Sequence, residues 1–166
     1  MLPAYLPNPV AALTGGGTPV DFGKNYADGR RIFGDGKTWR GLIVGILAGV
    51  GIGTIQILAA GAYGISFLPG LTLLSVILLA TGALLGDIVK SFFKRRCGVE
   101  RGARWPIADQ YDLLAGSFLL LLIFDPAWLF SEVTLPAFVI ILILTPILHR
   151  VVNIIGFAIK VKEVPW

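Results

Sequence analysis

Residues 67–96 read FLPGLTLLSVILLATGALLGDIVKSFFKRR, and this stretch decides the fold. Its first part, residues 67–86, is almost wholly apolar and has the length of about 20 residues that a helix needs to cross a bilayer. Its second part, GDIVKSFFKRR at residues 86–96, adds an aspartate, a serine and four basic side chains. A membrane helix is therefore expected, and its end carries more polar chemistry than a stop signal needs.

The composition of the whole chain also indicates a protein that lies in the lipid bilayer. Hydrophobic residues make up 55% of the 166 residues and charged residues only 14%, whereas a soluble domain carries about 25% charged residues. Mean hydropathy is +0.81. We therefore expect an all-α polytopic membrane protein that forms a single domain over residues 1–166.

Three further apolar segments have a length suited to crossing the membrane. Residues 42–63, 113–130 and 133–149 join residues 67–86 as four expected full spans. Residues 2–13 are too short to cross alone, so they are expected to form a partial or re-entrant membrane helix, or part of a fifth span. Along residues 42–63 and just before them, glycines recur every four residues, which favours close helix packing; they are Gly41, Gly45, Gly49 and Gly53.

All fourteen basic residues fall on one side of the expected spans. The positive-inside rule then predicts that the loops at about 14–40 and 87–112, and the C-terminus, face the cytoplasm of a cell-membrane protein. A net charge of +4 is compatible with anionic lipid headgroups or nucleic acid. No RNA-binding aromatic motif accompanies the basic residues, so membrane lipid and not nucleic acid is expected, and no protein partner is inferred.

Acidic residues are mixed with these cations, although a positively charged stop signal does not require acidic residues. If the second span continues as a helix to residue 96, Asp87, Ser91 and Lys94 share one face, flanked by Lys90 and Arg95. That face presents a carboxylate near membrane depth, then a hydroxyl, then cations toward water.

Asp109 and Asp112, three residues apart, share a second face just before the third span. Three carboxylates can thus converge where two helices enter the bilayer, and Mg²⁺ is commonly held by carboxylates together with substrate phosphates. The neighbouring cations would hold the remaining phosphate oxygens. The alternative is that these ionisable groups only snorkel and pair with one another.

A second polar segment, DGRRIFGDGKTWRG at residues 28–41, leads directly into the first span. Its Gly36-Lys37-Thr38 is similar to a P-loop, but Arg31 stands where that motif needs glycine and no strand is expected before it. It is therefore not a Walker A site. A Gly-rich turn before a helix N-terminus can still bind phosphate through backbone N–H groups.

These motifs resemble a known family. Gly86-Asp87, Ser91, Lys94-Arg95, Pro106, Asp109 and Asp112 resemble the signature of the CDP-diacylglycerol synthase family. GGGTPVDFGK, DGRRIFGDGKTWRG, GDIVKSFFKRR, WPIADQYD and the terminal KEVPW resemble its archaeal branch more closely, over most of the chain. The chain lacks the P-G-H-G-G stretch of the bacterial pattern, and Gln110 stands where that pattern has arginine.

The resemblance implies a reaction in which CTP and a polyprenyl ether-lipid phosphate, 2,3-di-O-geranylgeranylglycerol 1-phosphate, give a CDP-lipid and pyrophosphate with Mg²⁺. It implies Asp87, Lys94, Asp109 and Asp112 as catalytic residues, with the three aspartates on the metal. Phosphates would be held by Lys37, Lys94, Arg95 and Arg96, with hydroxyl contacts from Thr38 and Ser91. The nucleotide-side loop would contain Gly15, Gly16, Gly17, Pro19 and Asp21.

Two other classes of protein stay open at this point. A CDP-alcohol phosphotransferase also combines membrane helices, metal and a CDP-lipid, but Asp28-Gly29 is followed by Arg30-Arg31 and not by the pattern D-G-x2-A-R. A small transporter would explain charges in the membrane. It would not explain acids and cations gathered on one side.

Overall fold

In the computed structural model the chain is described at residues 1–64, 69–99 and 103–161, and this part is all-helical apart from two isolated β-bridges. The all-α prediction is confirmed. The start of the second expected span at residues 67 and 68, residues 100–102 of the second cytoplasmic loop and the terminal residues 162–166 lie outside the described residues. The helices are α1 (Leu2–Tyr5), α2 (Pro7–Thr14), α3 (Trp39–Tyr63), α4 (Leu73–Arg96), α5 (Ala108–Phe124), α6 (Pro126–Glu132) and α7 (Leu135–Ala158).

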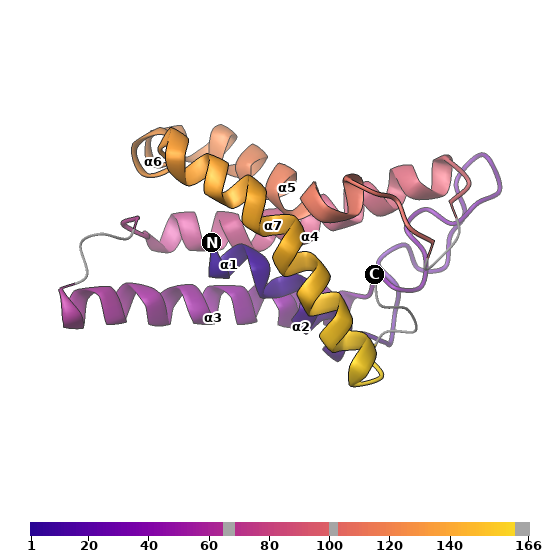
Figure 1. The fold of residues 1–166 in the computed structure, drawn as a ribbon. Helices are drawn as coiled ribbons and strands as arrows, with labels where there is room; N and C mark the ends of the chain where they lie inside the picture. The colour runs from indigo at the N-terminus through magenta and orange to yellow at the C-terminus, as the bar shows by residue number, and fades with distance from the viewer. Residues whose placement is uncertain (65–68, 100–102, 162–166) are drawn as a thin grey trace.

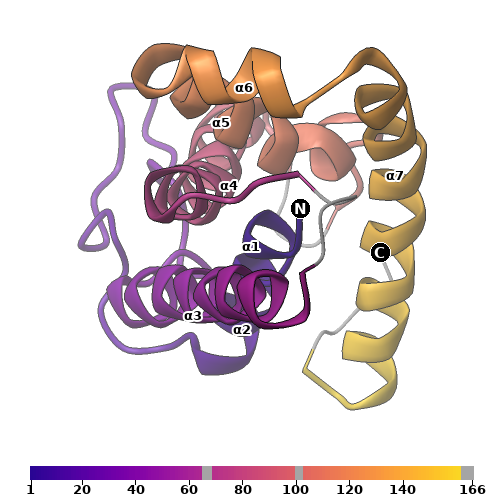
Figure 2. The ribbon, with the colours of Figure 1, turned by 90° about the vertical axis from the view of Figure 1, so that its left-hand side faces the viewer.

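The helices α3, α4 and α5 form a layered bundle. α3 and α4 lie alongside each other, α5 packs on the side of α4 away from α3, and α7 crosses the bundle obliquely (Figures 1 and 2). The short helices α1 and α2 pack against both α3 and α4, and whether residues 2–13 form a partial membrane segment stays a prediction. The long loop before α3 and the C-terminal end of α4 meet at one end of the bundle (Figure 1).

The glycine face of α3 lets the N-terminal helices approach its backbone closely. All four glycines of the repeat are buried, and a Cβ added at Gly49 would lie 2.7 Å from both the Ala80 Cβ and the Pro3 carbonyl oxygen. The prediction of close helix packing is confirmed. Its consequence is that α1 lies near Val76 and Ala80 in the first half of α4, whereas α2 lies nearer to Leu84 and the end of α4 that carries the polar residues.

α4 and α5 pack even more tightly, through Gly82, Gly86 and Gly116. A Cβ added at Gly82 would lie 2.5 Å from the Ser117 Cα, and one added at Gly86 would meet the backbone carbonyl of Asp112. Ser117 Oγ also donates a hydrogen bond of 2.8 Å to the carbonyl oxygen of Leu79 on α4. Because the backbones are this close, the height of Asp112 on α5 is fixed relative to Asp87 on α4.

α3, α4 and α7 are each long and apolar enough to cross a membrane. Residues 113–130, expected as one span, instead belong to α5 and α6, which meet at an angle of 119°. Pro126 has no N–H for the preceding turn, and the Asp125 carboxylate caps α6 by accepting from Trp128 N at 3.3 Å. The chain therefore has three span candidates in its described part, or four if the bent pair counts as one, and four full spans stays a prediction.

α7 extends beyond the expected residues 133–149 and contacts the bundle through apolar side chains such as Ile141 and Leu142 and through polar anchors. The Tyr5 hydroxyl and the Thr145 Oγ1 are 2.8 Å apart, and the Tyr111 hydroxyl donates to the Leu142 carbonyl at 3.0 Å. Most of the outer face of α7 is exposed, as suits a helix surrounded by lipid.

Candidate active site

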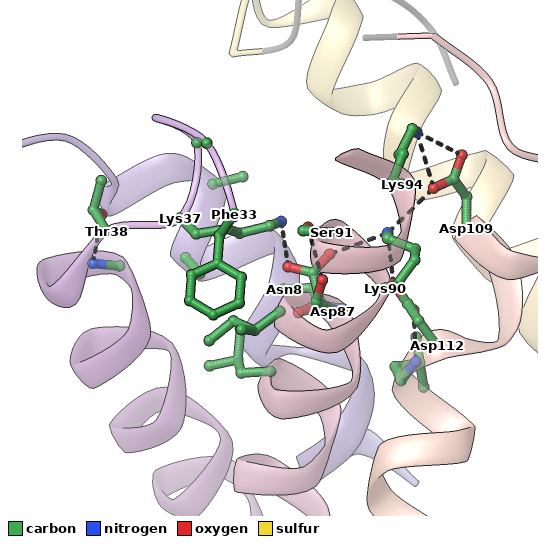
Figure 3. Close-up of a pocket in the computed structure, with 18 of the residues that line it drawn as sticks. Asn8, Phe33, Lys37, Thr38, Asp87, Lys90, Ser91, Lys94, Asp109 and Asp112 are labelled. Atoms are coloured by element: carbon green, nitrogen blue, oxygen red, sulfur yellow. Dashed lines mark hydrogen bonds and ion pairs between the residues drawn. The ribbon is translucent and has the colours of Figure 1, made fainter. Parts of the chain in front are cut away.

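A pocket of about 780 Å³ lies at the end of the bundle where α4 meets the long loop. Figure 3 shows charged side chains from α4, α5 and the loop pointing toward one another inside it. One part of its wall is charged and the other is more apolar, because α2, the start of α3 and α7 contribute aliphatic side chains beside the polar Asn8, His149 and Asn153. The apolar wall includes Ala11, Ala12, Leu42, Leu84, Leu148 and Val152.

The structure brings the three aspartates together around one ammonium group. Lys90 Nζ lies 3.1 Å from Asp87 Oδ1, 3.2 Å from Asp109 Oδ1 and 2.6 Å from Asp112 Oδ2. Lys90 and Asp87 lie on α4, whereas Asp109 and Asp112 lie on the first turns of α5. The tight glycine contact between these helices is what sets the three carboxylates at a common depth.

Two further lysines complete the charge balance of this cluster. Lys37, from the loop, forms an ion pair with Asp87 Oδ2, and Lys94 Nζ lies 3.2 Å from Asp109 Oδ2. Three carboxylates thus face three ammonium groups (Figure 3). Bringing the charges together in pairs offsets much of the cost of taking them out of water.

The loop before α3 is organised by Asp21, whose side chain is fully buried. Its carboxylate accepts from the backbone N–H groups of Phe33 at 3.0 Å and Gly34 at 2.9 Å, and pairs with Arg31 at 2.6 Å. Burial alone would raise the pKa of Asp21, but these hydrogen bonds hold it well below its usual range. The pKa of Arg31 is raised by the same pair. Asp21 therefore shapes the loop, and the pocket wall does not include it.

Arg96 joins this loop to α4. Its guanidinium pairs with Asp28 at 2.9 Å, donates to the Arg31 carbonyl at 2.6 Å, and lies 4.7 Å from the ring centroid of Tyr26. Among the described residues that line the pocket, Arg96 is absent. Its contacts hold the loop over the end of α4.

The two predicted hydroxyl contacts have local partners. Thr38 caps α3 by accepting from Gly41 N at 3.2 Å, and Ser91 Oγ donates to the Asp87 carbonyl at 2.8 Å. Both residues line the pocket.

The pocket therefore collects eight of the predicted site residues: Lys37, Thr38, Asp87, Ser91, Lys94, Arg95, Asp109 and Asp112. It does not collect Gly17, Pro19, Asp21 or Arg96 among its described lining residues. Pro19 instead forms a β-bridge with Thr38, which closes the base of the loop. Gly15 and Gly16 of the expected nucleotide-side loop are likewise absent from the described lining, and the ligand roles of all these residues stay predictions.

Sequence reasoning missed two residues of the site. Lys90 is central, although it was expected only to flank the polar face; its position three residues after Asp87 was the signal that it could reach the carboxylates. Asn8 on α2 also lines the pocket, with an Oδ1 that accepts no hydrogen bond from the described residues. Nothing in the sequence around Asn8 distinguishes it from an ordinary helix-start residue.

The donor set is compatible with a divalent metal ion. In the described residues, no group of three His, Cys, Asp or Glu side chains lies close enough to hold a metal ion by itself. The three aspartates nevertheless direct one oxygen each toward a single cationic position, now occupied by Lys90 Nζ. Mg²⁺ needs only one or two carboxylates, because water and phosphate oxygens complete its shell.

Known proteins match the whole chain. The family model described as CarS-like CDP-archaeol synthase matches residues 1–166. The CDP-archaeol synthases of Methanoregula boonei and Methanoculleus marisnigri are 66% and 64% identical to it, each over 100% of both chains. A solved structure, described as an intramembrane enzyme for archaeal membrane lipids biosynthesis, is 31% identical and superposes with a TM-score of 0.65 over 98% of this chain and 90% of the other.

The full-length matches agree with the apolar helices and with the charged pocket at their end. The multi-pass membrane character predicted from composition is confirmed, and so is the resemblance drawn from the motifs around Asp87 and Asp109. The chain belongs to the CDP-archaeol synthase family, and it is a membrane-embedded cytidylyltransferase that uses CTP in the synthesis of archaeal lipids.

Proposed function

We propose that the pocket binds CTP at its charged end and 2,3-di-O-geranylgeranylglycerol 1-phosphate along its apolar wall, and transfers CMP from one to the other. One observation carries this proposal: a single pocket joins the carboxylate–lysine cluster to the aliphatic side chains of α2, α3 and α7. A phosphate at the head of a lipid would be drawn to the lysines while its chains stay against the apolar wall.

The chemistry needs no protein nucleophile. An oxygen of the lipid phosphate attacks the α-phosphorus of CTP, the bond from that phosphorus to the bridging oxygen breaks, and pyrophosphate leaves. The attacking phosphate is already anionic, so a general base is not required. What the protein must supply is in-line placement and neutralisation of charge.

Three cations are placed to neutralise the phosphates. Lys37 reaches the pocket from the loop, and Lys94 and Arg95 reach it from the last turn of α4. In this proposal they bind the triphosphate and the incoming lipid phosphate. Arg95 is suited to gripping two oxygens at once, because its guanidinium is a planar fork.

We further propose that Asp87, Asp109 and Asp112 hold Mg²⁺. A bound Mg²⁺ would polarise the α-phosphate and stabilise the charge on the departing pyrophosphate. The contribution of the chain is to gather three carboxylates at one depth beside the phosphate-binding cations. The excess of basic residues on this side supports placing the pocket on the cytoplasmic face of the cell membrane, where CTP is available.

The test is a product assay with purified protein in lipid nanodiscs. CTP labelled at the α-phosphate, the lipid phosphate and Mg²⁺ should give a labelled CDP-lipid and one pyrophosphate for each. A CDP-alcohol phosphotransferase would instead consume a CDP-lipid and release CMP, and a transporter would form neither product. Failure to make labelled CDP-lipid in the presence of Mg²⁺ would refute the proposed reaction.

A further inference from the structure

Lys90 has a position that the proposed reaction does not explain. In the described part of the chain it is the only side chain within ion-pair distance of all three aspartates, and it is the only ion-pair partner of Asp112. Its side chain is 15% exposed and lines the pocket. An ammonium group there occupies the position toward which the three carboxylates converge.

That position cannot hold two cations at once. Mg²⁺ binds oxygen at about 2.0–2.1 Å, so a metal shared by these carboxylates must sit among the same oxygens that now lie 2.6–3.2 Å from Lys90 Nζ. Two cations that close would also repel each other strongly. If the metal enters, the ammonium group must leave at least part of the carboxylate cluster.

We propose that Lys90 is a tethered cation that holds the three carboxylates together in the free enzyme and moves onto phosphate oxygens when the metal and nucleotide bind. This inference rests on the proposed function. Lysine suits the role because its charge is compact and its four-carbon stem is flexible. Without Lys90, three carboxylates would face one another with only the lateral lysines, Lys37 and Lys94, to separate them.

The exchange couples the metal to the nucleotide. Metal alone must displace Lys90 when no anion is present to receive it. When CTP is bound, the displaced ammonium gains a triphosphate as its new partner. Metal binding is therefore weak without CTP and stronger with it, and by linkage CTP binds more strongly when metal is present.

Direct metal titration tests this coupling without turnover. The full-length protein is titrated with Mn²⁺ with and without CTP, in the absence of lipid phosphate, and free Mn²⁺ is followed by its electron paramagnetic resonance signal. In the wild type we expect CTP to strengthen Mn²⁺ binding. In Lys90→Met we expect Mn²⁺ alone to bind about tenfold more tightly than in the wild type, and the effect of CTP to shrink by a similar factor.

Lys94→Met is the matched control, since it removes an ammonium group one turn along α4 whose only ion-pair partner in the described part of the chain is Asp109. Its Mn²⁺ affinity without CTP should change much less. An unchanged or weakened Mn²⁺ affinity in Lys90→Met would overturn the inference. If Lys90→Met does not fold, Lys90→Arg serves instead: its guanidinium should hold the carboxylates more firmly and weaken Mn²⁺ binding without CTP, and a wild-type affinity would overturn the inference.

The outcome is separable from that of the proposed function. Coupled Mn²⁺ and CTP binding in a protein that makes no CDP-lipid would refute the reaction and leave the role of Lys90 standing. Absence of Mn²⁺ binding in wild type and variant, with and without CTP, would overturn the tethered-cation role together with the proposed metal site.

Discussion

A substitution in the tight contact between α4 and α5 tests how precisely the three carboxylates must be placed for activity. In Gly116→Ala, the new Cβ would collide most severely with the Gly82 carbonyl oxygen and would also lie 2.7 Å from Gly86 N, whereas ordinary contact begins at 3.4 Å. The backbone of α5 must therefore move away from α4 by at least about 0.7 Å. Asp112 lies one turn from this position, so it moves with the helix.

The expected loss follows from that displacement. A misplacement of about 1 Å in a catalytic constellation can cost roughly 100-fold in rate, so kcat/KM for CTP should fall between tenfold and about 100-fold. Overpacking should also destabilise the fold by about 1–3 kcal/mol. Activity must accordingly be expressed per folded protein, measured by size-exclusion chromatography and thermal unfolding in the same detergent.

Gly51→Ala is the matched control. Gly51 also lies inside a long membrane helix, but a Cβ added there has no atom within 4 Å. We expect it to leave kcat/KM unchanged and stability unchanged or slightly higher, because alanine is the better helix former. Wild-type kcat/KM in folded Gly116→Ala would refute the view that the α4–α5 contact positions the carboxylates.

Three further outcomes are expected. Asp112→Asn should reduce CMP transfer by at least about 100-fold, while Asp125→Asn, at the distant start of α6, should not; equal activities would argue against the aspartate cluster as the site. Cys97 is exposed and should react with a membrane-impermeant thiol reagent only from the cytoplasmic side, whereas Ser131→Cys in a Cys97→Ser background should react only from outside; labelling from the same side would contradict the topology. Asp21→Asn should lower stability at neutral pH by about 2 kcal/mol. Because the pKa of Asp21 is depressed in the fold, that difference should shrink as pH falls below about 4; a difference independent of pH in thermal unfolding would show that its charge is not what matters.

The sequence predicted the α4 side of the site because one helix carries it. A period of 100° per residue puts Asp87, Ser91 and Lys94 on one face, and the structure places all three in the pocket. The same arithmetic puts Arg96 about 180° from Asp87. That residue accordingly faces the loop, where it pairs with Asp28, so counting along the helix would have separated it from the face that carries Asp87, Ser91 and Lys94.

Counting residues along a helix does not predict contacts between a side chain and a backbone segment far away in the sequence. Asp21 was expected beside the nucleotide, but its carboxylate accepts from N–H groups twelve and thirteen residues further along the chain. No periodic pattern encodes such a turn. The break between α5 and α6 is a similar case: Pro126 sits in an apolar run long enough to span, and only the geometry shows that the chain bends there.

The polar cluster must satisfy two opposed requirements, and its composition reflects both. In the free protein, charges near membrane depth are costly unless they are paired, and three aspartates against three lysines leave the cluster neutral. In the proposed reaction the same carboxylates must release their partners. Lysines meet both needs, because a flexible ammonium group can neutralise a carboxylate in one state and a phosphate in the next. Arg31 and Arg96 are instead engaged in the loop, through Asp21 and Asp28, where a fixed fork suits a contact that does not change.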